Sequence, residues 1–249
     1  MLAAERRDLL VARLRRDGKL IARDLAAELG LSEESVRRDL RELAAAGLCQ
    51  RVYGGALPAS PLLGTNHAAR TKIAPESKRR VGARAAYLIT PGSTVILDGD
   101  TTGLAVAEAL RPDLDATIIT GHPAIATALL DHPTVKVFTL GGWVNRPGGA
   151  AMAEAASKIT ADLCLITGTG IHHEAGLCSN DPDQAALQRI LISRAADTYV
   201  LGSLDKIGHA AQYPVTSLSA VAGIVTDAPS YHPTIQQLRL QEINIIQAS

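Results

Sequence analysis

Five short segments of small and polar residues could together form an anion-binding site, because each follows an apolar run typical of a strand. Where a strand turns through Gly or Thr into a helix, backbone N–H groups and the positive end of the helix dipole converge. Lys206 would add a cation able to neutralise a phosphate. The candidate residues are Asp98, Gly99, Asp100, Thr101, Thr102, Gly121, His122, Gly141, Gly142, Gly168, Thr169, Gly170, Asp205 and Lys206.

Each of these segments also has a simpler explanation, since Thr101 or Thr102 could only cap a helix and a lone Lys after a strand is usually solvated. Convergence of several such loops at one sheet edge is harder to explain by capping. The pattern therefore predicts a polar pocket for a small anion. Trp143 could border this pocket or simply pack, and Arg146 could reach a phosphate from a turn, although a solvated turn is the simpler interpretation.

A second group of polar residues lies near the N-terminus, on a helix predicted over about residues 32–46. Ser32 is suited to cap this helix, and Val36, Leu40 and Leu43 repeat at core spacing. The opposite surface carries Arg side chains, which can bond guanine bidentately, and hydroxyls, which can hold phosphates. The candidates are Ser32, Ser35, Arg37, Arg38 and Arg41, with Arg51 added from a short β-wing predicted over Leu48–Tyr53.

The neighbouring elements favour a helix-turn-helix. A first amphipathic helix ends at Asp17-Gly18, and Ile21–Leu29 predicts a second, ended by Gly30. Two helices joined by a short Gly-containing turn form the motif whose second helix enters the major groove of DNA. The alternative is a three-helix bundle whose arginines only pair with Glu34, Asp39 and Glu42. Periodicity alone leaves the two interpretations evenly balanced.

From about Glu76 onward, short apolar runs alternate with helical segments. The expected strands are Ser93–Leu97, Ala116–Thr120, Val135–Leu140, Leu163–Thr167, Tyr199–Gly202 and Ala220–Val225, and the expected helices are Gly103–Leu110, Pro123–Leu130, Ala150–Ile159 and Pro182–Ala196. This alternation predicts an α/β domain with a mostly parallel sheet flanked by helices on both faces, which binds ligands outside the carboxyl ends of its strands. The stretch Gly54–Gly64 has the composition of a linker.

Composition excludes several classes of protein. The 249 residues carry 25 Lys and Arg against 25 Asp and Glu, and the aromatic share of 3% is too low for a base-stacking single-strand binder. No apolar run reaches the roughly 18 residues of a membrane helix, and the first residues lack the pattern of a secretory signal. We therefore expect a cytoplasmic protein with no membrane partner. The three cysteines, Cys49, Cys164 and Cys178, are too widely spaced for a disulfide framework or a zinc site.

The motif Ser32-Glu-Glu-Ser-Val-Arg-Arg-Asp-Leu-Arg-Glu-Leu43, followed by Gly47 and Tyr53-Gly-Gly-Ala56, resembles the N-terminal domain of the DeoR family of bacterial transcriptional regulators. Tyr53 stands where the family usually has His. This resemblance implies a winged helix-turn-helix domain over residues 1–57, followed by a linker over residues 58–75. It also implies a repressor that binds double-stranded operator DNA as a homo-oligomer.

The later elements resemble the effector domain of the same family, which is similar in fold to ribose-5-phosphate isomerase. The segment Asp98-Gly-Asp-Thr-Thr-Gly103 corresponds to the family's Asp-Ser-Gly-Thr-Thr-Thr loop, and Thr120-Gly-His122 corresponds to its Thr-Asn-Ser loop. The segment Asp205-Lys-Ile-Gly208 corresponds to the family's Asp/Ser-Lys-Phe-Gly stretch, and Leu140-Gly-Gly142 matches the family pattern at its position. The resemblance implies an α/β effector domain over residues 76–249 that senses a phosphorylated sugar or a related metabolite, with no cofactor.

The alternative function is a sugar-phosphate enzyme of the isomerase type with an appended DNA-binding-like domain, in which Asp98, Asp100 or Asp205 would supply the base. The residues argue against it, because Gly168-Thr-Gly-Ile-His-His173 lacks the acids of the isomerase-like loop. Gln184 and Gln188 replace the Glu and Lys of the family, which leaves the ligand class open. We expect no enzyme activity. His172 and His173 do not predict a metal site, since neighbours in sequence point apart and no third ligand has a supporting spacing.

Overall fold

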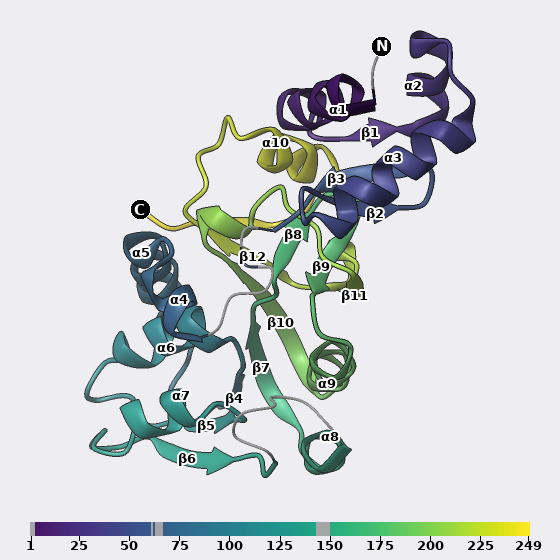
Figure 1. Ribbon diagram of the computed structural model, residues 1–249. Helices are drawn as coiled ribbons and strands as arrows, with labels where there is room; N and C mark the ends of the chain where they lie inside the picture. The colour runs from purple at the N-terminus through teal and green to yellow at the C-terminus, as the bar shows by residue number, and fades with distance from the viewer. Residues whose placement is uncertain (1–2, 61, 63–66, 143–149) are drawn as a thin grey trace.

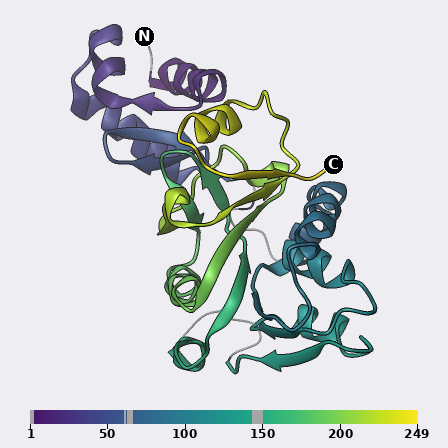
Figure 2. The same ribbon diagram turned by 180° about the vertical axis from the view of Figure 1, so that it is seen from behind.

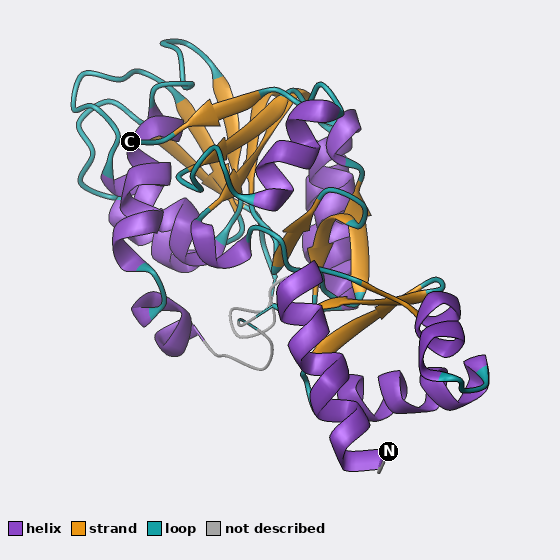
Figure 3. Cartoon of the chain, turned by 90° about the horizontal axis from the view of Figure 1, so that it is seen from above, coloured by secondary structure: helices purple, strands orange, loops and turns teal. Residues whose placement is uncertain are grey.

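A small N-terminal lobe of three helices and a three-stranded sheet lies beside a larger α/β lobe (Figures 1 and 3). The computed structural model describes residues 3–60, 62, 67–142 and 150–249. The elements of the small lobe are α1 (Ala3–Asp17), β1 (Leu20–Ile21), α2 (Ala22–Leu29), α3 (Glu33–Ala45), β2 (Cys49–Val52) and β3 (Gly55–Pro58). Leu10, Leu14, Leu25, Val36 and Leu40 are buried in its core, which confirms the predicted apolar spacing of the helices.

Two residues define the turn between α2 and α3. Gly30 has a φ of 65°, a left-handed conformation that Gly adopts readily at the end of a helix. Ser32 begins α3 because its Oγ accepts a hydrogen bond from the backbone N–H of Ser35 at 3.2 Å. Helices α2 and α3 therefore form the predicted helix-turn-helix.

The wing is a hairpin of β2 and β3, with β1 paired to the outer edge of β3. The strand predicted within Leu48–Tyr53 is confirmed, whereas the linker-like composition of Gly54–Gly64 is misleading at its start, because Gly55–Pro58 form β3. Gly55 packs so tightly that a Cβ atom there would lie 1.8 Å from the backbone oxygen of Leu20. Gly and Pro are typical of linkers as well as of tight strand contacts, so composition alone could not separate the two.

The large lobe is built on a seven-stranded sheet in which every paired strand is parallel, in the order β13-β12-β10-β7-β4-β5-β6. The strands are β4 (Thr94–Leu97), β5 (Thr117–Thr120), β6 (Lys136–Thr139), β7 (Ala161–Ile166), β10 (Ala195–Gly202), β12 (Gly223–Thr226) and β13 (Ile245–Gln247). This topology confirms the predicted parallel α/β architecture.

Helices cover both faces of this sheet (Figures 1 and 2). Because successive side chains of a strand point to opposite faces, Val95 and Leu97 of β4 join one core and Ile96 joins the other. The first core is covered by α5 (Pro75–Ala86), α6 (Asp100–Glu108) and α7 (Pro123–Ala128), and the second by α8 (Ala150–Ser157), α9 (Pro182–Ser193) and α10 (Pro233–Leu240). Burial on both faces explains why Val95, Ile96 and Leu97 of the central strand β4 form an uninterrupted apolar run.

Some elements differ from the sequence predictions. The helix predicted from Gly103 begins at Asp100, the strand predicted from Ala220 begins at Gly223, and the helix predicted to Ala196 ends at Ser193. The linker contains a short helix, α4 (His67–Lys72), and a second sheet has the antiparallel order β11-β9-β8, with β8 (Gly170–His172), β9 (Gly176–Ser179) and β11 (Tyr213–Thr216). Strands β8 and β9 are short and fully buried, so they show no polar alternation. Within the described ranges, no helix has the length and apolarity needed to cross a membrane.

Candidate functional site

Three arginines project from the exposed side of α3. The side chains of Arg37, Arg38 and Arg41 are all exposed. Arg37 forms an ion pair with Glu33 at 2.5 Å and Arg41 forms one with Glu34 at 2.6 Å, whereas Arg38 makes no hydrogen bond or ion pair with the described part of the chain. Exposed ion pairs contribute little to stability, so DNA phosphates could readily replace these glutamates.

The carboxylates of Asp39 and Glu42 serve a different purpose. Asp39 is buried and pairs with Arg6 of α1, and Glu42 pairs with Arg7 of the same helix at 2.8 Å. The bundle interpretation is therefore correct for the Arg41–Glu34 pair but wrong for Asp39 and Glu42, which attach α1 to α3. The exposed arginines of α3 are not neutralised by them.

The wing adds two exposed side chains near α3. Arg51 lies on β2, and Tyr53 at the hairpin tip is completely exposed. A groove between wing and helix is lined in part by Arg37, Arg51 and Tyr53. Ser32 is exposed at the start of α3 and Ser35 is half-buried. Tyr53 was not among the sequence candidates, because only the hairpin places its ring at the tip.

A cleft opens in the large lobe where the loops after β4 and β7 meet. The chain continues from β4 to β5 on one side, whereas β7 lies on the other side of β4, so the strand order reverses between β4 and β7. Open α/β sheets bind ligands at such a switch point. The cleft contains about 550 Å³ of empty space, including its mouth, and is lined by Leu62, Arg70, Gly99, Asp100, Thr101, His122, Thr167, Gly168, Thr169, Ser179, Asn180, Gln184 and Lys206.

Half of the residues predicted from the strand-end loops line this cleft, namely Gly99, Asp100, Thr101, His122, Gly168, Thr169 and Lys206. The others lie elsewhere, and they are Asp98, Thr102, Gly121, Gly141, Gly142, Gly170 and Asp205. Asp98 and Thr102 are buried beneath the cleft floor, and a Cβ atom at Gly121 would meet the sulfur of Met152 at 2.7 Å. Trp143 and Arg146 lie outside the described residues.

Asp98 is held by two side chains under the cleft. His122 Nε2 lies 3.0 Å from one of its carboxylate oxygens, and Gln188 Nε2 donates to the other at 3.0 Å. Burial alone would lower the pKa of His122, but the hydrogen bond and the charge of Asp98 outweigh burial and raise it. Gln188 is completely buried, whereas Gln184 lines the cleft. Both carboxylate oxygens of Asp98 thus have side-chain partners in a buried network below the cleft.

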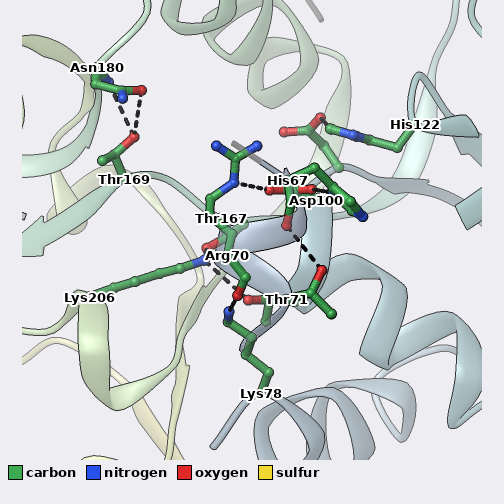
Figure 4. Close-up of polar contacts among 12 residues, drawn as sticks. His67, Arg70, Thr71, Lys78, Asp100, His122, Thr167, Thr169, Asn180 and Lys206 are labelled. Atoms are coloured by element: carbon green, nitrogen blue, oxygen red, sulfur yellow. Dashed lines mark hydrogen bonds and ion pairs between the residues drawn. The ribbon is translucent and has the colours of Figure 1, made fainter. Parts of the chain in front are cut away.

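Asp100 is paired with two side chains of the linker helix α4. Arg70 Nε donates to one carboxylate oxygen of Asp100, and His67 Nδ1 lies against the other (Figure 4). Burial by itself would raise the pKa of Asp100, but the charge of Arg70 and the hydrogen bond from His67 lower it. Asp100 is therefore an ionised group in contact with the Arg70 guanidinium at the mouth of the cleft.

Two buried lysines lie next to this pair. Lys206 Nζ donates to Thr102 Oγ1 at 3.1 Å and to Thr167 Oγ1, and Lys78 Nζ donates to the backbone oxygen of Arg70 (Figure 4). Burial lowers the pKa of Lys206 to about 8, partly opposed by the charge of Asp205, and burial also lowers the pKa of Lys78. A bound anion would stabilise the charged form of both lysines.

The chain that leaves the wing is attached to the same cleft. Ala59 forms a parallel bridge with Ala210, and Ser60 Oγ donates to the backbone oxygen of Thr169 at 2.6 Å. Thr169 Oγ1 in turn donates to Asn180 Oδ1 at 3.1 Å. The wing is therefore continuous with residues that touch the cleft wall. Sequence reasoning missed Leu62, Arg70, Ser179 and Asn180, because no local pattern brings them to the strand ends.

His172, His173 and Glu174 gather where β8 turns towards β9. Their candidate ligand atoms all lie within 4.8 Å of one another, and the two imidazole centroids are 4.2 Å apart. The expectation that these neighbouring side chains point apart is therefore wrong, because the chain curls at this turn and the Glu174 N–H donates to His172 Nδ1 at 3.1 Å. Glu174 also forms an ion pair with Lys19 of the small lobe at 2.7 Å. Its carboxylate thus connects the two lobes.

A winged helix-turn-helix joined to an α/β domain with a cationic cleft defines a class of DNA-binding regulators that carry a small-molecule sensor. Residues 6–61 match the family model of the DeoR-like helix-turn-helix domain, and residues 73–228 match that of the DeoR C terminal sensor domain. The chain belongs to the DeoR family of transcriptional regulators.

Curated relatives of similar length support this assignment. The glycerol-3-phosphate regulon repressor of Escherichia coli K12 is 26% identical, over 98% of this chain and 99% of the relative. The HTH-type transcriptional repressor GlcR of Bacillus subtilis is 28% identical, over 91% of this chain and 89% of the relative. Among solved structures, ribose 5-phosphate isomerase A of Methanocaldococcus jannaschii aligns with a TM-score of 0.41 and 14% identity, over 53% of this chain and 54% of that one.

Proposed function

We propose that this regulator is a repressor that binds operator DNA as a homo-oligomer. Its operator affinity changes when a phosphorylated sugar, or a related small anionic metabolite, binds in the cleft of the large lobe. The observation that carries the effector class is the pair of cationic side chains, Arg70 and Lys206, that line the cleft, with the buried Lys78 behind them on the backbone oxygen of Arg70. Burying two lysines is costly unless an anion or a hydrogen-bonding group compensates them.

The remaining polar groups of the cleft suit the uncharged part of such a ligand. Thr101, Thr169, Asn180 and Gln184 offer hydroxyl and amide groups that can bond sugar hydroxyls. The cleft lies at the start of α6, where the backbone N–H groups favour an anion. One relative, the E. coli glycerol-3-phosphate regulon repressor, carries a phosphorylated metabolite in its name, which is consistent with this class of effector.

The arrangement of carboxylates favours sensing over catalysis. The Asp98 carboxylate bonds His122 and Gln188, and Asp100 is paired with Arg70 and His67. Asp205 does not line the cleft. An isomerase needs a base that can reach the proton it removes from a substrate carbon, and no carboxylate among the described lining residues is left unpaired for that purpose.

The effector proposal is tested by a thermal-shift screen of phosphorylated sugars against the matching unphosphorylated sugars. A ligand that binds only the folded protein raises its melting temperature. We expect shifts that require the phosphate group and that are lost in Lys206→Met but kept in Lys136→Met, which removes an exposed lysine of β6. Equal shifts with the unphosphorylated sugars would contradict the effector class. Turnover of a sugar phosphate would contradict the assignment as a regulator without activity.

The proposed DNA contacts are tested by the pair Arg38→Ala and Arg84→Ala. Arg38 is exposed on α3 and has no hydrogen-bond or ion-pair partner among the described residues, and Arg84 is exposed on α5 of the large lobe. Loss of one base-edge contact typically costs about 1–3 kcal/mol, or roughly 5- to 150-fold in affinity. Operator affinity should fall by this factor in Arg38→Ala alone. Equal affinities of the two variants would contradict the role of α3. Operator footprints and mass measurements of the free protein test whether two copies occupy two half-sites.

A further inference from the structure

The effector cleft contains an anion supplied by the protein itself. The Asp100 carboxylate lines the cleft and takes both a guanidinium N–H of Arg70 and the imidazole of His67 (Figure 4). Its side chain is 18% exposed and that of Arg70 is 29% exposed, so a small ligand can reach the pair from the cleft. The Arg70 guanidinium at the cleft mouth is therefore already paired with a carboxylate.

The backbone at Asp100 supports this interpretation. Asp100 has a φ of 38°, in the left-handed region that side-chain-bearing residues rarely adopt and that Gly adopts readily. Such a conformation persists only where surrounding interactions hold it, and it is concentrated at binding sites and switches. At this position the Asp100 side chain contacts Arg70 and His67. The strained residue and its two partners thus form one unit.

The partners of Asp100 belong to the connection between the two lobes. Both Arg70 and His67 lie on α4, in the linker that follows the wing. The backbone of α4 is held in turn by Lys78, whose Nζ donates to the Arg70 oxygen. The start of the linker is attached to the large lobe as well, through the Ala59–Ala210 bridge and the bond from Ser60 to Thr169. Any ligand that changes the partner of Arg70 therefore acts directly on the linker.

A phosphate group and the Asp100 carboxylate cannot share Arg70 without cost. Two like charges at hydrogen-bond distance repel one another, and the repulsion is strong where burial limits screening by water. A phosphate that bonds Arg70 must therefore displace Asp100 or bind more weakly because of it.

We infer that Asp100 is an internal competitor of the effector. In the effector-free protein its carboxylate holds Arg70 and thereby fastens α4 to the cleft, and the phosphate of the effector binds by replacing Asp100 as the partner of Arg70. Asp100 thereby raises the effector concentration at which the regulator responds, and it transmits occupancy of the cleft to the linker. This inference rests on the proposed anionic effector and adds the residue that regulates its binding.

The test is a calorimetric titration of the full chain with inorganic phosphate at constant ionic strength. Asp100→Asn keeps the shape of the side chain, tolerates the left-handed backbone and removes the charge. Asp131→Asn removes an exposed carboxylate after α7 and serves as the matched control. We expect Asp100→Asn to bind phosphate about tenfold more tightly than the wild type, since removal of one competing charged hydrogen bond is worth at least that factor. Asp131→Asn should bind like the wild type.

Two further variants separate this inference from the proposed effector class. If Arg70→Gln and Lys206→Met both bind phosphate as well as the wild type, the cleft is not the anion site and the proposed effector class fails. If these variants lose binding while Asp100→Asn binds phosphate no more tightly than the wild type, the effector class stands and the competitor role of Asp100 is overturned. Absence of phosphate binding to Asp100→Asn also overturns it.

Limited proteolysis provides a readout of the linker itself. Lys72 is exposed at the end of α4, so release of this helix should expose the following bond to trypsin. Asp100→Asn should be cut after Lys72 several-fold faster than the wild type without phosphate, and phosphate should restore protection because it gives Arg70 a new partner. Identical cleavage rates at Lys72 in the two proteins would contradict the attachment of α4 through Asp100.

Discussion

Replacement of Lys206 by Met should change how the stability of the large lobe depends on pH. Lys206 is 3% exposed, and burial lowers its pKa from 10.5 to about 8. This decrease corresponds to about 3 kcal/mol of unfavourable free energy for keeping the ammonium charged in the folded state. Its ordinary pKa returns when the chain unfolds, so the unfolded state binds the proton more tightly.

The sign of the effect follows from proton binding. Between about pH 8 and 10.5 the unfolded state retains a proton that the folded state has lost, so the free energy of unfolding of the wild type rises with pH across this window. Lys206→Met lacks this contribution. The stability difference between variant and wild type should therefore favour the variant below about pH 8 and decrease by about 3 kcal/mol as the pH rises to 10.5.

Urea unfolding of the two proteins at a series of pH values measures this difference. Loss of the bonds from Lys206 to Thr102 and Thr167 offsets the gain by about 1 kcal/mol each at every pH, so the change with pH is the decisive quantity. Lys136→Met, which removes an exposed lysine, provides the control. If the stability curves of wild type and Lys206→Met run parallel from pH 7 to pH 10, the charge of Lys206 is not destabilised by burial and the reasoning is refuted.

Three further predictions concern the lobes and their connection. Gly55→Ala should destabilise the small lobe by about 1–3 kcal/mol or more, because its Cβ would lie 1.8 Å from the Leu20 oxygen. Thermal unfolding measures this loss of stability. An unchanged melting temperature would contradict the packing of β1 on β3. Ser60→Ala removes the bond to the Thr169 oxygen and the acceptor of the Leu62 N–H, at a cost of about 1–3 kcal/mol. Hydrogen exchange at the Leu62 amide should therefore accelerate. Unchanged protection of this amide would argue against its bond to Ser60. All three cysteines are buried, and burial raises the pKa of Cys49 to about 11. A thiol reagent should therefore react with them only as the protein unfolds. Rapid reaction of a thiol in the native protein would contradict this prediction.

Local sequence patterns were sufficient for the helices of the small lobe and for the strands of the sheet. The spacing of Val36, Leu40 and Leu43 predicts α3 because a helix repeats every 3.6 residues, and Ser32 marks its start because its hydroxyl bonds a neighbour three residues away. The apolar runs of β4, β5 and β7 are visible because both faces of these strands are buried. The boundaries were less accurate, as at Ala220 and Ala196, since neighbouring elements compete for the same few residues.

Contacts between distant segments could not be derived in this way. Patterns at the strand ends indicated an anion site and supplied half of the cleft residues, but Arg70 comes from the linker and Asn180 from beyond the unpredicted strand β9. Nor could periodicity choose between Arg6 and the arginines of α3 as the partner of Asp39, because that choice depends on how α1 packs on α3.

The sequence by itself determined the two lobes, their order, the arginine-rich helix and the family, because these depend on periodicity, capping and motifs that are read within a few turns of the chain. Only the tertiary structure decided which side chains meet. The meeting of Asp100 with Arg70, of Ser60 with Thr169 and of Lys19 with Glu174 joins residues separated by 30 to 155 positions. Such pairings follow from the packing of the whole molecule, since electrostatic and hydrogen-bond energies depend on distance in space and not on distance along the chain.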